Sequence, residues 1–205
     1  MLALDHIVIA TRDPKQAAED FANEHAVQTI KGGKHENWGT YNYLAYFSNN
    51  SYIEWLGIFD EETAKISDNP LIQQLVASFE DNKEGMIQFA LRTHFMDDFV
   101  DYYNDQRFSY KGPIPGKRIK PDGTLLEWCM LFPSTTSNLP FIIEWGNGKN
   151  IPDDKNLINT KKIISIHTLG KDVLEKVYQL NFSNNYASLE NSSLKISDTL
   201  TFKIT

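Results

Sequence analysis

The stretch Leu4-Asp-His-Ile-Val-Ile-Ala-Thr11, near the start of the chain, resembles Met86-Ile-Gln-Phe-Ala-Leu-Arg-Thr93, near its middle. Both are apolar runs with few charges that end in threonine, a pattern typical of buried strands. His6 in the first run aligns with Gln88 in the second, at an offset of 88 − 6 = 82 residues. A repeat of this kind predicts that the chain contains a duplicated unit that begins with a strand.

In each copy the first strand is followed by a helix and then by further strands. Asp13 and Pro14 are typical of a helix N-cap and of the first helical position, and they predict a helix over Lys15–His25. The two copies end in the similar stretches Tyr52-Ile-Glu-Trp55 and Ile142-Ile-Glu-Trp145, which predict equivalent last strands.

These patterns predict an α+β fold built from tandem βαβββ modules, with a partial third module at the end of the chain. We assign residues 1–58 to the first module, 59–85 to a helical insertion or linker, and 86–146 to the second module. Residues 161–205 form the partial third module, which starts with a strand at Ile163–Thr168 and lacks a closing Glu-Trp strand.

Composition excludes several classes of function. The net charge of −7 argues against nucleic acid or an anionic membrane surface as a partner, because phosphate groups attract clustered Lys and Arg. No apolar stretch approaches 18 residues, which predicts that no helix spans a membrane. The single cysteine, Cys129, excludes an intrachain disulfide and a thiolate metal cluster. We expect a cytoplasmic protein with a small-molecule ligand, compatible with a homodimer.

The duplication gives four polar residues a common position. Side chains alternate between the two faces of a strand, so aligned residues in the two copies should point the same way. His6 aligns with Gln88 on the first strands, and Glu54 aligns with Glu144 on the last. If the two units pack with their concave sheets facing, the four groups meet and suit a divalent ion such as Ni, Co, Mn, Fe(II) or Zn. The third copy has Ser165 at the first-strand position, which is a poor ligand.

Each of these residues also has an ordinary structural role to set against a functional one. A single histidine such as His6 is often held by a backbone partner. Glu54 and Glu144 could face solvent, or pair with a basic residue such as Arg92 or Arg118. A buried glutamate without such a partner would be costly, and this favours a site for the two glutamates.

A loop between two glycine positions supplies further candidates. His35 lies between Gly33 and Gly39, where glycine lets the backbone approach a ligand. We predict substrate contacts from His35, Asn42 and Trp38. For His35 two alternatives stay open: an exposed loop histidine, or the second histidine of an iron site with two histidines and one carboxylate.

The strand order and the motifs together resemble a known superfamily. Tandem strand–helix–three-strand units, with His or Gln on the first strand and Glu on the last, resemble the vicinal oxygen chelate proteins. These include glyoxalases, bleomycin-resistance proteins and extradiol dioxygenases. The string Leu4–Thr11, followed by Gly32-Gly33-Lys-His35 and by Tyr52-Ile-Glu54, resembles glyoxalase-like domain proteins over roughly residues 2–180.

The resemblance implies a metal site between the modules and a substrate that presents neighbouring oxygen atoms to it. His6, Glu54, Gln88 and Glu144 would be the ligands, and Glu144 or Glu54 would act as the general base of a metal-dependent lyase or isomerase. One alternative is a metal-free protein that sequesters a small molecule, as bleomycin-resistance proteins do. Another is an extradiol-type dioxygenase that uses iron with His6 and His35.

Overall fold

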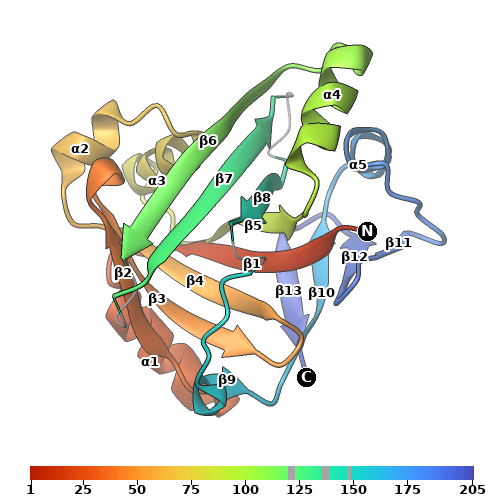
Figure 1. Ribbon diagram of the computed structural model, residues 1–205. Helices are drawn as coiled ribbons and strands as arrows, with labels where there is room; N and C mark the ends of the chain where they lie inside the picture. The colour runs from red at the N-terminus through yellow and green to blue at the C-terminus, as the bar shows by residue number, and fades with distance from the viewer. Residues whose placement is uncertain (120–122, 135–138, 147–148) are drawn as a thin grey trace.

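The computed structural model describes residues 1–119, 123–134, 139–146 and 149–205. Its first two units follow the same order of strand, helix and three strands, which confirms the predicted α+β fold of tandem βαβββ units (Figure 1). The first unit consists of β1 (Ala3–Ala10), α1 (Pro14–His25), β2 (Ile30–His35), β3 (Thr40–Phe47) and β4 (Ser51–Ile58), with a short 3-10 turn at Glu36–Trp38. The second unit consists of β5 (Gly85–Arg92), α4 (Met96–Gln106), β6 (Tyr110–Ile119), β7 (Leu125–Pro133) and β8 (Phe141–Trp145). The division of the chain at residues 58, 85 and 146 stays a proposal.

Two helices join these units, and local capping explains where helices begin. The joining helices are α2 (Glu61–Ile66) and α3 (Pro70–Glu80). The Asp13 carboxylate accepts a hydrogen bond from the backbone N–H of Gln16, and Pro14 is the first residue of α1, as predicted. Asn69 caps α3 in the same way ahead of Pro70.

The first two units join edge to edge in one sheet of order β2-β3-β4-β1-β5-β8-β7-β6. The antiparallel pair β1–β5 forms the centre, so the expectation that two separate sheets face each other is wrong. The outer strands β2 and β6 nevertheless come into contact, because the continuous sheet curls into a half-barrel. The curl gives the sheet a concave inner face and a convex outer face.

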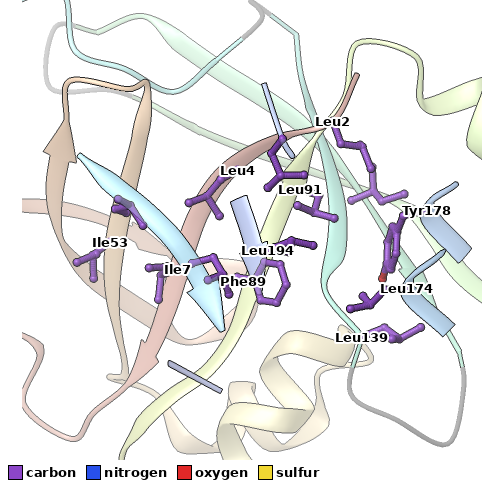
Figure 2. Packing of buried hydrophobic residues seen from close by; sticks show 14 of the residues in the cluster. Leu2, Leu4, Ile7, Ile53, Phe89, Leu91, Leu139, Leu174, Tyr178 and Leu194 are labelled. Carbon is purple, nitrogen blue, oxygen red and sulfur yellow. The ribbon is translucent and has the colours of Figure 1, made fainter. Parts of the chain in front are cut away.

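The partial third unit forms a second, smaller sheet. It consists of β10 (Ile163–Thr168), α5 (Lys171–Tyr178), β11 (Tyr186–Ser188), β12 (Ser193–Ile196) and β13 (Thr201–Ile204). A 3-10 turn at Lys155–Leu157 and the short β9 (Ile158–Asn159), which pairs with β3, precede it in the chain. Its side chains pack on the outer face of the large sheet. Figure 2 shows Leu174 and Leu194 of the third unit in one cluster with Leu4 and Phe89 of β1 and β5.

The inner face is covered only in part. Leu71 and Leu75 of α3 pack against Val8 and Ala90 at the centre of the sheet. The rest of the inner face lines the cavity described below. Within the residues that the structure describes, no helix has the length and apolar character needed to cross a membrane.

Candidate functional site

The inner face of the curled sheet holds a small cavity that opens into a larger groove. The cavity has a volume of about 50 Å³ and the groove about 1030 Å³. The two spaces share five lining residues, which therefore form the neck between them: His35, Trp38, Arg118, Trp128 and Trp145. Deeper in the cavity lie His6, Asn42, Tyr52, Glu54 and Phe141.

A fully buried carboxylate holds the His6 ring in place. His6 Nδ1 lies 2.7 Å from Asp5 Oδ1, while Asp5 Oδ2 accepts hydrogen bonds from Arg92 at 2.9 Å and from Trp145 Nε1 at 3.0 Å. Burial alone would raise the pKa of Asp5, but the hydrogen bonds and charges of His6 and Arg92 outweigh it and lower that pKa. Since an ionised carboxylate only accepts hydrogen bonds, His6 Nδ1 carries a proton directed at Asp5, and Nε2 points toward the cavity.

Glu54 faces the free side of this ring. Its Oε2 lies 3.6 Å from His6 Nε2, and its Oε1 accepts a hydrogen bond from Asn42 Nδ2 at 2.5 Å. Asn42 is itself fixed, because its Oδ1 accepts a hydrogen bond from the backbone N–H of Gly33 at 2.8 Å. A Cβ atom on Gly32 would lie 1.9 Å from Asn42 Oδ1, so a side chain at this position would displace Asn42.

Aromatic rings enclose the His6–Glu54 pair. Tyr52 stacks on His6 with ring centroids 4.6 Å apart, and Phe141 meets the same ring edge-on at 5.5 Å. Burial raises the pKa of Tyr46, which contacts Tyr52, to about 12, so its hydroxyl keeps its proton at neutral pH. The cavity is therefore mainly apolar and has one acid–base pair in its wall.

Two basic side chains lie at the neck. His35 Nδ1 lies 3.1 Å from Thr40 Oγ1. Burial lowers the pKa of His35, and the nearby positive charge of Arg118 lowers it further against the opposing effect of Glu54. The His35 ring is therefore neutral at neutral pH, and Arg118 is the cation that faces the cavity.

The backbone register shows which residues of the two units are equivalent. The N–H of Thr11 donates to the carbonyl of Leu56 at 3.1 Å, and the N–H of Thr93 donates to the carbonyl of Ile143 at 3.0 Å. Thr11 and Thr93 are the aligned ends of the first strands, so Leu56 and Ile143 hold the same position on the last strands. The true offset there is 143 − 56 = 87 residues, whereas the Glu-Trp repeat implied 144 − 54 = 90.

This difference of three residues separates the two glutamates. With the offset of 87, Phe141 is the equivalent of Glu54, and Glu144 is the equivalent of Gly57. An odd shift moves a side chain to the opposite face of a strand. Glu144 accordingly lies toward the outer face, where its Oε2 is 3.4 Å from the backbone N of Met96 at the start of α4. It lines the outer groove at the edge of the sheet but not the inner cavity. The prediction that Glu54 and Glu144 share one face is wrong for this reason.

Gln88 keeps its predicted equivalence to His6 but makes other contacts. Its Nε2 donates to the carbonyl of Leu139 at 2.9 Å, and its Oε1 accepts from the backbone N–H of Phe89. Gln74 of α3 lies over it, 3.5 Å away. Gln88 therefore does not line the cavity, whereas His35, Asn42 and Trp38, predicted as substrate contacts, do.

Comparison with known proteins identifies the family. Residues 4–178 match the family model described as a glyoxalase-like domain. The chain belongs to the glyoxalase-like domain family. This match confirms the resemblance seen in the sequence and places the glyoxalase-like protein in the vicinal oxygen chelate superfamily. No curated protein matches its sequence.

Solved structures share the fold of the glyoxalase-like protein at low sequence identity. A hypothetical protein from Staphylococcus aureus is 17% identical, with a TM-score of 0.77, and the match covers 98% of this chain and 89% of that one. This coverage includes the third unit. Methylmalonyl-CoA epimerase from Streptomyces coelicolor, in complex with 2-nitronate-propionyl-CoA, is 18% identical, with a TM-score of 0.52 and coverage of 71% and 99%. The epimerase from Mycobacterium tuberculosis is 17% identical, with a TM-score of 0.50 and coverage of 70% and 86%.

The predicted four-ligand metal site does not fit these residues. His6 Nε2 and Glu54 Oε2 point into one space and are carried by the expected strands. The other two positions are taken by Gln88, which bonds to the backbone, and by the apolar ring of Phe141. Across the described ranges, no three histidine, cysteine, aspartate or glutamate side chains gather closely enough to hold a metal ion, and this also leaves the proposed iron site with His35 unsupported.

Asp5 and Arg118 shape the site, but local patterns in the sequence do not predict this role. The pairing of β1 with β5 is irregular between Leu4 and His6, and this bulge allows adjacent Asp5 and His6 side chains to meet. Strict alternation along the strand would have placed them on opposite faces. Arg118 reaches the cavity from β6, which approaches β2 only because the whole sheet curls.

Proposed function

We propose that this glyoxalase-like protein binds a small carbonyl compound in its cavity and transfers a proton at the carbon next to the carbonyl group. The observation that carries the proposal is the pair of His6 Nε2 and Glu54 Oε2, 3.6 Å apart in an apolar cavity. In the proposed resting state the Nδ1 proton is directed at Asp5, and Nε2 is unprotonated where it faces the Glu54 carboxylate. The pair can then take up one proton and hold it between the two atoms.

In the proposed step the Glu54 carboxylate acts as general base. The C–H bond breaks, its proton passes to Glu54, and its electron pair moves onto the carbonyl oxygen to give an enolate. His6 Nε2 can take the proton from Glu54, and Asp5 stabilises the imidazolium that results. Return of the proton to the same carbon, or to a neighbour, completes an epimerisation or isomerisation.

We propose that this chemistry runs without a metal bound by four protein ligands. The two remaining ligand positions are those of Gln88 and Phe141, whose side chains are otherwise engaged or apolar. A divalent ion held by His6 and Glu54 alone would have fewer protein ligands than the three or four typical of such sites. The assignment to a metal-dependent lyase or isomerase is therefore replaced by a metal-independent one.

Deuterium exchange tests the proposal directly. The purified protein is incubated in D2O with a panel of carbonyl compounds, and loss of the C–H signal is followed by proton NMR. The panel contains 2-oxo acids, their esters, and methylmalonyl-CoA, because two structures with this fold are methylmalonyl-CoA epimerases. We expect at least one compound to exchange, and we expect Glu54→Gln to slow it by about 100-fold or more, the usual contribution of a general base.

The matched control is Glu24→Gln, which changes an exposed glutamate of α1 and should leave the rate unchanged. Exchange that is equally fast in Glu54→Gln would show that Glu54 is not the base.

The second candidate function is sequestration of a ligand without chemistry, which the aromatic walls of the cavity and neck favour. Tight binding of a panel compound with no exchange would support it.

A further inference from the structure

Arg118 lies at the junction of three cavities in the protein. It lines the inner cavity, the outer groove and a third space of about 280 Å³ beside Asn150. Its side chain lies along the backbone of Gly33, where an added Cβ would come within 3.1 Å of Arg118 Cδ and 3.2 Å of its Nη1. The glycine therefore provides the room that directs this long side chain to the neck.

Arg118 carries a positive charge at the neck. Among the described residues, Arg118 takes part in no ion pair, whereas Arg92, the other arginine on the sheet near the site, pairs with Asp5 at 2.9 Å. A half-buried guanidinium loses part of its hydration, and an oxyanion that takes the place of the lost water stabilises its charge. Within the described ranges, the neck therefore presents a cation with no ion-pair partner.

Arg118 and Glu54 face the same space from different strands. Both line the inner cavity, and the charges of both act on the ring of His35 and on Tyr46. An anionic group held at the neck by Arg118 would place the atoms bonded to it inside the cavity, where Glu54 and His6 lie. The cavity volume of about 50 Å³ limits these atoms to a short chain, since on this measure a single water molecule already needs about 10–15 Å³.

We propose that Arg118 binds a carboxylate of the ligand, so that the protein selects short 2-oxo acids over neutral carbonyl compounds; this rests on the proton-transfer function proposed above. The planar guanidinium matches a carboxylate with two parallel hydrogen bonds. Its positive charge also stabilises the negative charge that the enolate develops next to the carboxylate. Arg118 thereby acts as the residue that determines specificity.

The test compares one carbon acid with and without its charge. The probes are 2-oxobutanoate and its methyl ester, which share the same exchangeable CH2 group. Dissociation constants are measured by isothermal titration calorimetry, and exchange in D2O by proton NMR, for the wild type, Arg118→Gln and Arg118→Lys. Arg107→Gln, which changes an exposed arginine at the end of α4, is the matched control.

We expect the wild type and Arg107→Gln to bind the acid about tenfold to a hundredfold more tightly than the ester. This preference should disappear in Arg118→Gln and return in part in Arg118→Lys, which restores the charge but not the paired hydrogen bonds. Equal affinity of the wild type for acid and ester, or a preference that survives in Arg118→Gln, would overturn the proposal. Inorganic phosphate that binds more tightly than the acid would also overturn it, because the anion would then be a phosphate.

The same measurements separate this proposal from the proton-transfer function. Exchange of acid and ester at equal rates, slowed by Glu54→Gln, would refute the role of Arg118 and leave proton transfer in place. Binding that prefers the acid and depends on Arg118, without exchange of any probe, would refute proton transfer and leave the carboxylate site.

Discussion

Replacement of Asp5 by asparagine should strongly destabilise the fold, although Asp5 touches no solvent and only adjoins the cavity. The Asp5 carboxylate accepts hydrogen bonds from three donors: His6 Nδ1, Arg92 and Trp145 Nε1, at 2.7, 2.9 and 3.0 Å. Asparagine has one acceptor oxygen, and its NH2 group would face at least one of these donors. The Arg92 guanidinium would also lose its only ion-pair partner in the described part of the chain.

The expected loss follows from the buried pair. Removal of one partner of a buried ion pair typically costs about 3–5 kcal/mol, because it leaves an uncompensated charge. For a chain of this size, each kcal/mol corresponds to about 2–4 °C in Tm, so Asp5→Asn should lower Tm by roughly 6–20 °C. The free energy of unfolding is measured by urea denaturation, and Tm by calorimetry.

Two further variants isolate the cause. Asp105→Asn, at an exposed position of α4, should change the stability by less than about 0.5 kcal/mol. Arg92→Met, added to Asp5→Asn, should recover part of the loss because it removes the unpaired charge. A loss below about 1 kcal/mol in Asp5→Asn, or no coupling between the two sites, would show that this network does not stabilise the fold.

Three other changes follow from the same geometry. The pKa of Asp5 is lowered in the folded chain, so its ionised form stabilises the protein above the unfolded pKa of about 3.9. This stabilisation is lost as the pH falls through the folded pKa. Urea denaturation between pH 3 and 5 should therefore show a steeper loss of unfolding free energy in the wild type than in Asp5→Asn. Gly32→Ala should displace Asn42, since the added Cβ would lie 1.9 Å from Asn42 Oδ1. Titration calorimetry should then show weaker ligand binding, and an unchanged affinity would contradict this. Glu144→Gln should leave the exchange rate unchanged, because Glu144 lines the outer groove but not the inner cavity that holds His6 and Glu54. A loss as large as that of Glu54→Gln would mean that both glutamates serve one site.

Much of the fold could be predicted from local patterns. The cap at Asp13, the proline at the start of α1 and the strand that contains His6 depend on neighbours in the sequence, and all three are present. The order of strands and helices along the chain was predictable because the two units repeat it. His6 and Glu54 could be placed together because both lie on adjacent, parallel strands of one unit, β1 and β4.

The register between the units could not be predicted from matching letters. The shared Ile-Glu-Trp stretches suggested an offset of 90 residues, but the backbone hydrogen bonds of Thr11 and Thr93 give 87. Because a strand alternates faces at every residue, this odd error placed Glu144 on the wrong side of the sheet. The contribution of Asp5 depends on a bulge, and that of Arg118 on the curl of the whole sheet, and neither leaves a local pattern.

The most direct measurement is the deuterium exchange rate of chelator-dialysed protein, with and without added Ni, Co, Mn or Zn. If His6 and Glu54 transfer the proton without a four-ligand metal site, the dialysed protein should exchange its substrate at the full rate, and the added ions should not raise it. Exchange that vanishes after dialysis and returns only with one of these ions would contradict this mechanism and restore the metal-dependent one.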